Sequence, residues 1–335
     1  IMLDGTSHAY QLLGRKELAE LLEEMIEAFL KLELVPLSVQ THATLSASRG
    51  ILRYYESVKR PDLLGAVEKV FSLYMKEGMT ENHANYNWFG RPDWTEPCAV
   101  IDSFMLAVGL WKNTGRSQYL EAAHNIFHNA IEYGQRPNGG FGCDVCAGAH
   151  DEFLSPRQDL FEAYWCCSMR GGEGLARAVE YSWFIDGDKI LLPFYNDSTA
   201  RFTFSDGRAT LKQTTGYPVN GDVRLEVVES DAMGEKVLKL FVPSWSRKDS
   251  VRLYLNNAEV PVAFYEDGFV GMKTVLSAGT VIQLSFEIHM RIEDTINANS
   301  IKGYHSFRHG FLMLGMENGG EAVRLGKETG FDNVG

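Results

Sequence analysis

Apolar residues recur every three to four positions through the first half of the chain. Residues 15–33 place six apolar side chains on one face of a helix, with acidic residues between them: Leu18, Leu21, Leu22, Met25, Ile26 and Phe29. Pro36 then ends this helix, because proline lacks the amide hydrogen that a continuing helix needs. The same spacing predicts further helices over about 39–58, 61–76, 94–112, 117–133 and 156–181.

The predicted helical hairpins look like copies of one another. Residues 51–64 and 107–120 each end a helix, turn on polar residues and restart with apolar side chains, and residues 12–18 form a fainter third copy. A repeat made of two helices is typical of an α-solenoid or of a closed double ring of helices, an (α/α) toroid. An irregular helical bundle is the alternative interpretation.

After Trp183 the spacing of apolar residues changes to every second position. Short alternating segments are separated by Gly, Asp and Asn turns, at 189–195, 200–204, 223–228, 236–242, 251–255, 260–264 and 281–288. Strands at this spacing predict an antiparallel β-sandwich. We therefore expect an α+β multidomain protein, with an α-helical, toroid-like domain over 1–184 and a β-sandwich domain over 185–335.

Composition narrows the classes of function. The 44 acidic and 32 basic residues give a net charge of −12, which argues against a nucleic-acid partner because such binding depends on basic side chains at the phosphates. No apolar run approaches the length of a membrane span, and residues 1–15 lack the order of a signal peptide. The five cysteines are too few for a disulfide scaffold, so thiolate chemistry in a reducing compartment such as the cytoplasm is favoured, although the compartment stays open.

Two short motifs carry candidate metal ligands. Glu96 and Cys98 are two residues apart, and Cys166 and Cys167 are adjacent. Together they offer one oxygen and three sulfurs, the number of ligands that tetrahedral zinc takes. Residues one or two apart do not share a helix face, so Glu96 and Cys98 need a distorted first helical turn, which Pro97 between them makes feasible. Of Cys166 and Cys167, one would bind the ion directly and the other from the flank. The alternative is that these cysteines are simply small buried apolar residues.

Cys143 and Cys146 form a competing source of ligands. A Cys-x-x-Cys knuckle in a loop, combined with the 166–167 pair, would give four sulfurs and a purely structural ion. The five thiols cannot all bind one tetrahedral ion, so the two sets are alternatives. A redox role for the knuckle is disfavoured, because no thioredoxin-like βαβ pattern surrounds it.

Two long connections, 78–93 and 135–155, flank the cysteine motifs. Loops of this length within a compact domain tend to be functional, so we expect a site at their shared end. Aromatic residues gather in the same stretches, and sugars bind through their apolar faces to such rings, although aromatics near helix ends are also ordinary core. They are Tyr86, Trp88, Phe89, Trp94, Tyr164 and Trp165. His42 is interpreted either as a hydrogen-bonded core residue or as a functional one.

These motifs together resemble glycoside hydrolase family 127, the β-L-arabinofuranosidases. The resemblance lies in Thr95-Glu-Pro-Cys98, a helical hairpin, and Trp165-Cys-Cys167 followed by strands. It extends to Thr41-His-Ala, to the polar turn near Asp62 and to the strand over 240–246, and so spans about 38–310. The resemblance implies a retaining glycoside hydrolase acting on β-L-arabinofuranosides or a related plant-derived sugar, with a zinc-bound cysteine as its nucleophile.

The resemblance also implies roles for single residues. The zinc ligands would be Glu96, Cys98, Cys166 and Cys167, with Cys166 as the nucleophile. Glu81, in the loop before Glu96, is the candidate acid/base. The substrate would contact His42, Trp88, Trp94 and Trp165.

The sequence also departs from the family pattern. Ser-Met-Arg-Gly-Gly follows Cys167 where the family has proline and asparagine, which indicates a divergent branch. The resemblance implies an (α/α)6-type helical domain, and the helices predicted over 1–184 are about half of those in such a closed ring, so the ring is incomplete. Either the N-terminal half of the ring is missing or another copy completes it as a homo-oligomer. The alternative function is a non-catalytic carbohydrate-binding or scaffold protein with a structural zinc site.

Overall fold

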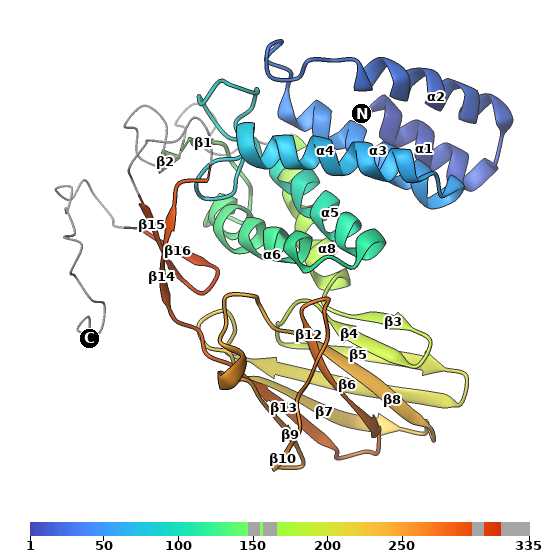
Figure 1. Ribbon diagram of the computed structural model, residues 1–335, viewed down its shortest axis with the longest axis vertical. Helices are drawn as coiled ribbons and strands as arrows, with labels where there is room; N and C mark the ends of the chain where they lie inside the picture. Colours follow the sequence, from blue (N-terminus) through green and yellow to red (C-terminus); the bar gives the residue numbers. More distant parts are fainter. Residues whose placement is uncertain (147–154, 157–165, 297–304, 316–335) are drawn as a thin grey trace.

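The computed structural model describes residues 1–146, 155–156, 166–296 and 305–315, and it divides into a helical part and a β part (Figure 1). The helices are α1 (Met2–Leu13), α2 (Lys16–Leu30), α3 (Thr41–Val58), α4 (Pro61–Glu77), α5 (Pro97–Thr114), α6 (Ser117–Ile126), α7 (Glu132–Gly134) and α8 (Cys166–Glu180). A short π-helix, η1 (Phe127–Ile131), joins α6 to α7. Among the described residues, no helix has the length and apolar character needed to cross a membrane.

The helical hairpins share one kind of turn. The residues that follow α1, α3 and α5 are Gly14, Lys59 and Gly115, and all three adopt the left-handed conformation. Each donates its amide hydrogen to the carbonyl four residues earlier, which closes the helix before the next one starts. The predicted copies at 12–18, 51–64 and 107–120 therefore correspond to three real hairpins, although α1 itself was not predicted to be helical.

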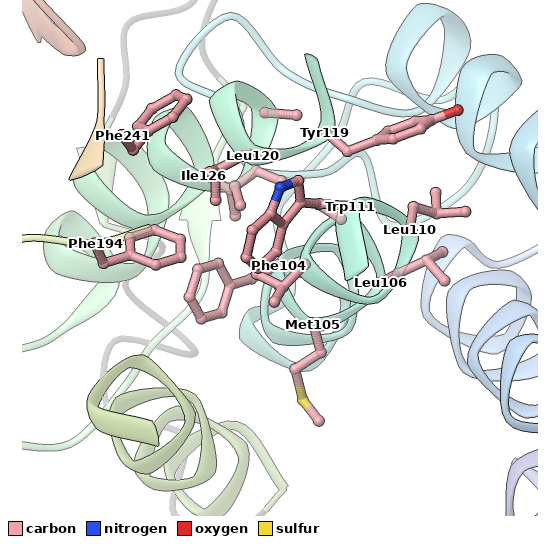
Figure 2. Packing of buried hydrophobic residues seen from close by; sticks show 14 of the residues in the cluster. Phe104, Met105, Leu106, Leu110, Trp111, Tyr119, Leu120, Ile126, Phe194 and Phe241 are labelled. Carbon is pink, nitrogen blue, oxygen red and sulfur yellow. The ribbon is translucent and has the colours of Figure 1, made fainter. Parts of the chain in front are cut away.

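Helix α5 is the centre of the helical part. Its side chains are buried on all sides, and it packs against α3, α6 and α8. A helix that is apolar all round belongs in a core. Figure 2 shows Phe104, Leu110 and Trp111 of α5 pointing toward different neighbours. Because Cys98 lies in its first turn, this buried helix carries one of the predicted metal ligands.

The β part is a sandwich of two sheets. The six-stranded sheet has the order β10-β9-β13-β7-β6-β5, and the five-stranded sheet has the order β11-β12-β8-β4-β3. The strands are β3 (Phe184–Asp186), β4 (Lys189–Leu192), β5 (Ser198–Phe204), β6 (Gly207–Thr215), β7 (Val223–Ser230), β8 (Glu235–Phe241), β9 (Arg252–Leu255), β10 (Ala258–Val260), β11 (Ala263–Phe264), β12 (Phe269–Val275) and β13 (Val281–Ser285). The prediction of a sandwich is confirmed, but its purely antiparallel character is wrong at one place, because β4 and β8 pair in parallel.

A further small sheet lies beside the helices and apart from the sandwich (Figure 1). It consists of β14 (Met290–Asp294), β15 (His305–His309) and β16 (Leu312–Leu314). Arg308 of β15 is fully buried, and its guanidinium contacts Glu293 at 2.6 Å and the ring of His83 at 2.9 Å. Asn129 of η1 donates to the carbonyl of Phe311 and accepts from the amide of Met313. The end of the described chain therefore returns to the helical part.

Several leucines of the α1–α2 hairpin, and of the segment that follows α2, have exposed side chains. They are Leu12, Leu13, Leu21, Leu30, Leu32 and Leu37. An incomplete ring is expected to leave such apolar surface, because each hairpin of a helical repeat packs on the next. Whether a further segment or a second copy covers this surface stays a prediction.

Aromatic rings join the helices to the sandwich. The ring of Trp111 stacks on Phe269 with centroids 5.9 Å apart. His124 is fully buried and stacks on Phe194 at 4.3 Å. Its Nε2 lies 2.8 Å from the Pro193 carbonyl, and its Nδ1 lies 3.1 Å from the Tyr217 hydroxyl. Burial holds the pKa of His124 well below its usual value of 6.5, so the interface is built around a neutral imidazole.

We predict that acid weakens the fold through this histidine. A histidine with a lowered pKa stays neutral when folded and takes up its proton on unfolding, so its stabilisation is present above pH 6.5 and is lost as the pH falls below that value. The free energy of unfolding should then fall by up to about 1.4 kcal/mol per pH unit for this group. Urea unfolding of wild type and His124→Phe between pH 7 and 5 measures the slope. His8→Gln, at an exposed position, is the control. An equal slope in wild type and His124→Phe would contradict the prediction.

Candidate metal centre

The starts of α5 and α8 bring three thiols together. The Sγ atoms of Cys98, Cys166 and Cys167 all lie within 4.8 Å of one another. Cys98 is 0% exposed and Cys167 is 5% exposed, whereas Cys166 is exposed at the rim. Packing of α8 on α5 therefore joins residues that are far apart in the sequence into one sulfur-rich group.

Two glycines allow α8 to approach this closely. A Cβ on Gly171 would lie 2.0 Å from the ring of Phe141, and a Cβ on Gly174 would lie 2.1 Å from the side chain of Ile101. At Gly171 the ring of Phe141 leaves no room for a side chain, whereas at Gly174 the end of the Ile101 side chain would have to move. The glycine that departs from the family pattern at 171 therefore has a structural reason here.

Glu96 lies beside the thiols because it precedes the helix. It is the N-cap residue of α5, with an extended backbone, and its amide donates to Oδ1 of Asn85 at 2.9 Å. Ligand atoms of Glu96, Cys98 and His42 lie within 4.8 Å of one another. The expected difficulty of a Glu-x-Cys pair on one helix face thus does not arise. Burial raises the pKa of the Glu96 carboxyl, and nearby His42 acts in the opposite direction.

One sulfur of the cluster is favoured as the thiolate. Cys167 accepts hydrogen bonds from the thiols of Cys143, Cys98 and Cys166, and these bonds lower the pKa of Cys167 to about 3. The same bond to Cys167 is the main cause that raises the pKa of Cys98 and of Cys143. The cluster therefore stabilises a negative charge among its sulfurs, which suits the binding of a soft cation.

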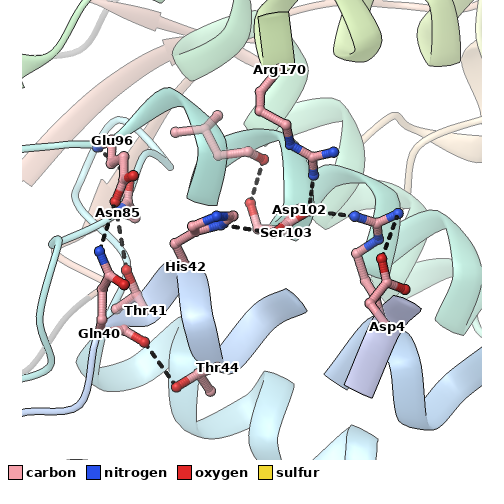
Figure 3. Close-up of polar contacts among 12 residues, drawn as sticks. Asp4, Gln40, Thr41, His42, Thr44, Asn85, Glu96, Asp102, Ser103 and Arg170 are labelled. Carbon is pink, nitrogen blue, oxygen red and sulfur yellow. Dashed lines mark hydrogen bonds and ion pairs between the residues drawn. The ribbon is translucent and has the colours of Figure 1, made fainter. Parts of the chain in front are cut away.

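His42 is held by a carboxylate that sequence analysis missed. Its Nδ1 lies 2.9 Å from Oδ2 of Asp102, and Asp102 also contacts Arg49 at 2.5 Å and Arg170 (Figure 3). Burial acts to raise the pKa of Asp102, but His42 and the two arginines hold it below its usual value. Asp102 lies four residues after Cys98, so the i, i+4 spacing was the signal that could have found it.

Two of the three predicted substrate-binding tryptophans lie at the cluster. Trp94 packs against Cys98, Cys143 and Cys167. The ring of Trp88 meets Trp94 edge-on, with centroids 5.7 Å apart. Trp165 lies outside the described residues.

The cysteines of the predicted knuckle separate. Cys143 is 2% exposed and packs against Cys98 and Cys167. Cys146 packs against Tyr86 instead, and its sulfur lies 3.9 Å from the carbonyl oxygen of Asn85. The Cys143–Cys146 pair is thus divided between two clusters, and only Cys143 joins the group of thiols.

Glu81 lies in the same loop as Glu96 but contacts the C-terminal strands. Its side chain is buried, and both carboxylate oxygens accept from the amide of Ile296, at 3.0 and 3.1 Å. Its carbonyl accepts from Arg308 at 3.5 Å. These contacts attach the 80–83 turn to β15, and the role of Glu81 as an acid stays a prediction.

Comparison with known proteins agrees with the family suggested by the motifs. Residues 189–288 match the family model for the middle domain of β-L-arabinofuranosidases of glycoside hydrolase family 127. Comparison of the sequence with curated proteins gives no match. The resemblance to family 127 is confirmed, as a divergent one.

Solved structures share the fold. A glycoside hydrolase superposes with a TM-score of 0.76 at 17% identity, covering 93% of this chain and 59% of that chain. A family 127 β-arabinofuranosidase superposes with a TM-score of 0.73 at 16% sequence identity, and the match covers 92% of this chain and 54% of that chain. A family 127 β-L-arabinofuranosidase from Geobacillus stearothermophilus T6 superposes with a TM-score of 0.66 at 16% sequence identity, and the match covers 91% of this chain and 56% of that chain. The predicted combination of a toroid-type helical domain and a β-sandwich is thereby confirmed, and this chain spans little more than half the length of these proteins.

We predict that Gly171→Ala loosens the thiol cluster. The added methyl group would collide with Phe141 and push α8 away from the loop that carries Phe141 and Cys143, at a cost of about 1–3 kcal/mol in unfolding free energy. Buried Cys167 should then react faster with a thiol reagent. Gly172→Ala is the matched control, because a Cβ there meets nothing within 4 Å, and it should stabilise α8 by about 0.5–1 kcal/mol. Equal effects of the two substitutions would argue against the packing role of Gly171.

Proposed function

We propose that the protein is a retaining glycoside hydrolase that uses a zinc-bound cysteine and acts on β-L-arabinofuranosides or a related plant-derived sugar. The observation that carries this proposal is the convergence of Cys98, Cys166 and Cys167 beside Glu96, with Cys166 as the exposed member. The match of residues 189–288 to a β-L-arabinofuranosidase domain supports the substrate class.

The donor set suits zinc. A tetrahedral zinc site with Zn–S bonds of about 2.3 Å holds its sulfurs about 3.8 Å apart, and the three thiols already lie within 4.8 Å of one another. Glu96 would supply the oxygen ligand. Bound zinc would keep the ligating thiols deprotonated at neutral pH, which is the chemistry that a sulfur nucleophile needs.

Cys166 is proposed as the nucleophile because a sugar can reach it. Its sulfur would attack the anomeric carbon as the bond to the leaving oxygen breaks, which forms a glycosyl-cysteine thioether. Water would then attack the same carbon and release the sulfur, so two inversions give overall retention. Cys98 and Cys167 are buried and are proposed as ligands only.

Glu81 is proposed as the acid/base. It would donate a proton to the leaving oxygen in the first step and take one from the attacking water in the second. Ile296 holds the carboxylate through its amide hydrogen, so the segment that follows β14 would take part in positioning the acid.

Substrate binding is proposed for the residues around the thiols. His42, oriented by Asp102, would hydrogen-bond a sugar hydroxyl. The faces of Trp88 and Trp94 would contact the apolar side of the sugar ring. Trp165 belongs to the same proposal but lies outside the described residues.

A non-catalytic carbohydrate-binding or scaffold protein with a structural zinc is the second candidate. The observation in its favour is that both oxygens of Glu81 are bound to the backbone of Ile296. Stoichiometric zinc together with bound sugar, but without hydrolysis of a panel of arabinosides, would support this candidate.

We predict that Cys166→Ser abolishes turnover. A serine hydroxyl is a far weaker nucleophile than a thiolate, so kcat should fall by about 10³-fold or more with little change in thermal stability. The measurement is hydrolysis of an aryl β-L-arabinofuranoside, with circular dichroism to check the fold. Val179→Ala, at an exposed position near the other end of α8, should retain wild-type activity. Wild-type activity in Cys166→Ser would refute the proposed nucleophile.

We predict that the loss of rate in Glu81→Gln depends on the leaving group. Without a proton donor, the first step should slow by about 10²–10⁴-fold for alkyl glycosides and much less for nitrophenyl glycosides, whose leaving groups need no proton. Relative kcat/KM values across a series of leaving groups measure this dependence. A uniform loss for every leaving group would show that Glu81 acts through its contact with Ile296 and not as the acid.

A further inference from the structure

The thiol cluster holds one more sulfur than the proposed zinc site uses. Cys98, Cys143 and Cys167 pack together, with exposed fractions of 0%, 2% and 5%. Glu96 is also buried. Cys166 is the exposed thiol among these residues. Three sulfurs and one oxygen are thus buried together without counting Cys166.

The position of Cys143 is built by a network of hydrogen bonds. Buried Arg136 donates to the carbonyl of Cys143 at 3.0 Å and to Oδ1 of Asp144 at 2.9 Å. The amide of Asp144 donates to Oγ1 of Thr95 at 3.0 Å, and the amide of Thr95 donates to the Asp144 carbonyl at 2.9 Å. Thr95 directly precedes Glu96, so the loop of Cys143 is joined to the segment that carries Glu96 and Cys98.

We infer that Cys143 is a metal-binding thiol, and that Cys98, Cys143, Cys167 and Glu96 hold the metal without Cys166. This inference rests on the metal centre of the proposed function but not on its catalysis. The buried set has the same donors as the proposed one, with Cys143 in the place of Cys166. Cys143 packs against Cys98 and Cys167, but its sulfur is not in the group of three that lie within 4.8 Å of one another, so its side chain would have to rotate toward Cys98 to complete the set.

With the additional sulfur, Cys166 could react with a sugar without leaving the metal short of a ligand. A cysteine that forms a bond to a sugar becomes a neutral thioether, which is a weaker ligand than a thiolate. With Cys143 as a ligand, the metal keeps four donors while Cys166 is modified. Cys166 would then be an exchangeable ligand at the rim, and the three buried thiols would be permanent ones.

The sulfur count of zinc-loaded Cys166→Ser tests the inference. X-ray absorption at the zinc edge is expected to show three sulfurs, from Cys98, Cys143 and Cys167, with zinc still bound in a one-to-one ratio. Two sulfurs would overturn the inference, because Cys143 would then act only as a hydrogen-bond donor to Cys167. Cys143→Ser should lower zinc affinity in chelator competition by at least about tenfold, and Cys146→Ser, in the other cluster, should leave it unchanged.

Alkylation of the wild-type protein is a test that does not depend on folding of a variant. Iodoacetamide should modify exposed Cys166 first in the zinc-loaded protein, as located by mass spectrometry, and the singly modified protein should keep its zinc. Release of zinc on modification of Cys166 would overturn the inference. Wild-type protein that never binds zinc defeats the metal centre and the inference together, whereas zinc binding without hydrolysis defeats only the proposed hydrolase.

Discussion

The buried carboxylate of Asp102 is the interaction on which the arrangement of the helical part depends. It lies in α5 at 0% exposure and contacts His42 and Arg49 of α3 and Arg170 of α8. A buried charge is tolerated only when it is paired, so α3 and α8 must both present their partners to α5. The same contacts place His42 and the start of α8 beside Cys98.

The close approach of α8 to α5 acts together with this charge network. Gly171 and Gly174 remove the side chains that would keep α8 away from Phe141 and Ile101. Arg170 then reaches Asp102 from the second turn of α8, shortly after the cysteine pair. Steric fit and charge pairing therefore specify one position of α8 against α5, and this position determines which sulfur atoms lie close together. A site of four thiols and one carboxylate follows from the packing of two helix starts and one anchored loop.

The β part is joined to the helical part at two places. It packs on the helical part through aromatic rings around Trp111 and His124, and the chain then leaves it to form β14, β15 and β16 beside the helices. Arg308 and Ile296 reach the loop that carries Glu81. The two halves of the molecule are thus connected by the aromatic interface and by the returning strands, which hold the proposed acid.

The sequence alone determined the local structure of this protein. Apolar spacing of three to four residues, and then of two, predicted the helices after α1 and seven strands of the sandwich, because each pattern buries one face of its element. The elements that were not predicted are α1, β3, β6, β10, β12, β14, β15 and β16. Pro61 marked the first residue of α4, whereas α5 begins at Pro97, three residues later than predicted. The motifs also pointed to Glu96, Cys98, Cys166 and Cys167 as one group. Only the tertiary structure decided that Cys143 joins these thiols while Cys146 does not, that Asp102 orients His42, and that Glu81 contacts β15 and Ile296. A local pattern specifies which face of an element is buried, but the distance between two side chains depends on which elements pack together and how closely.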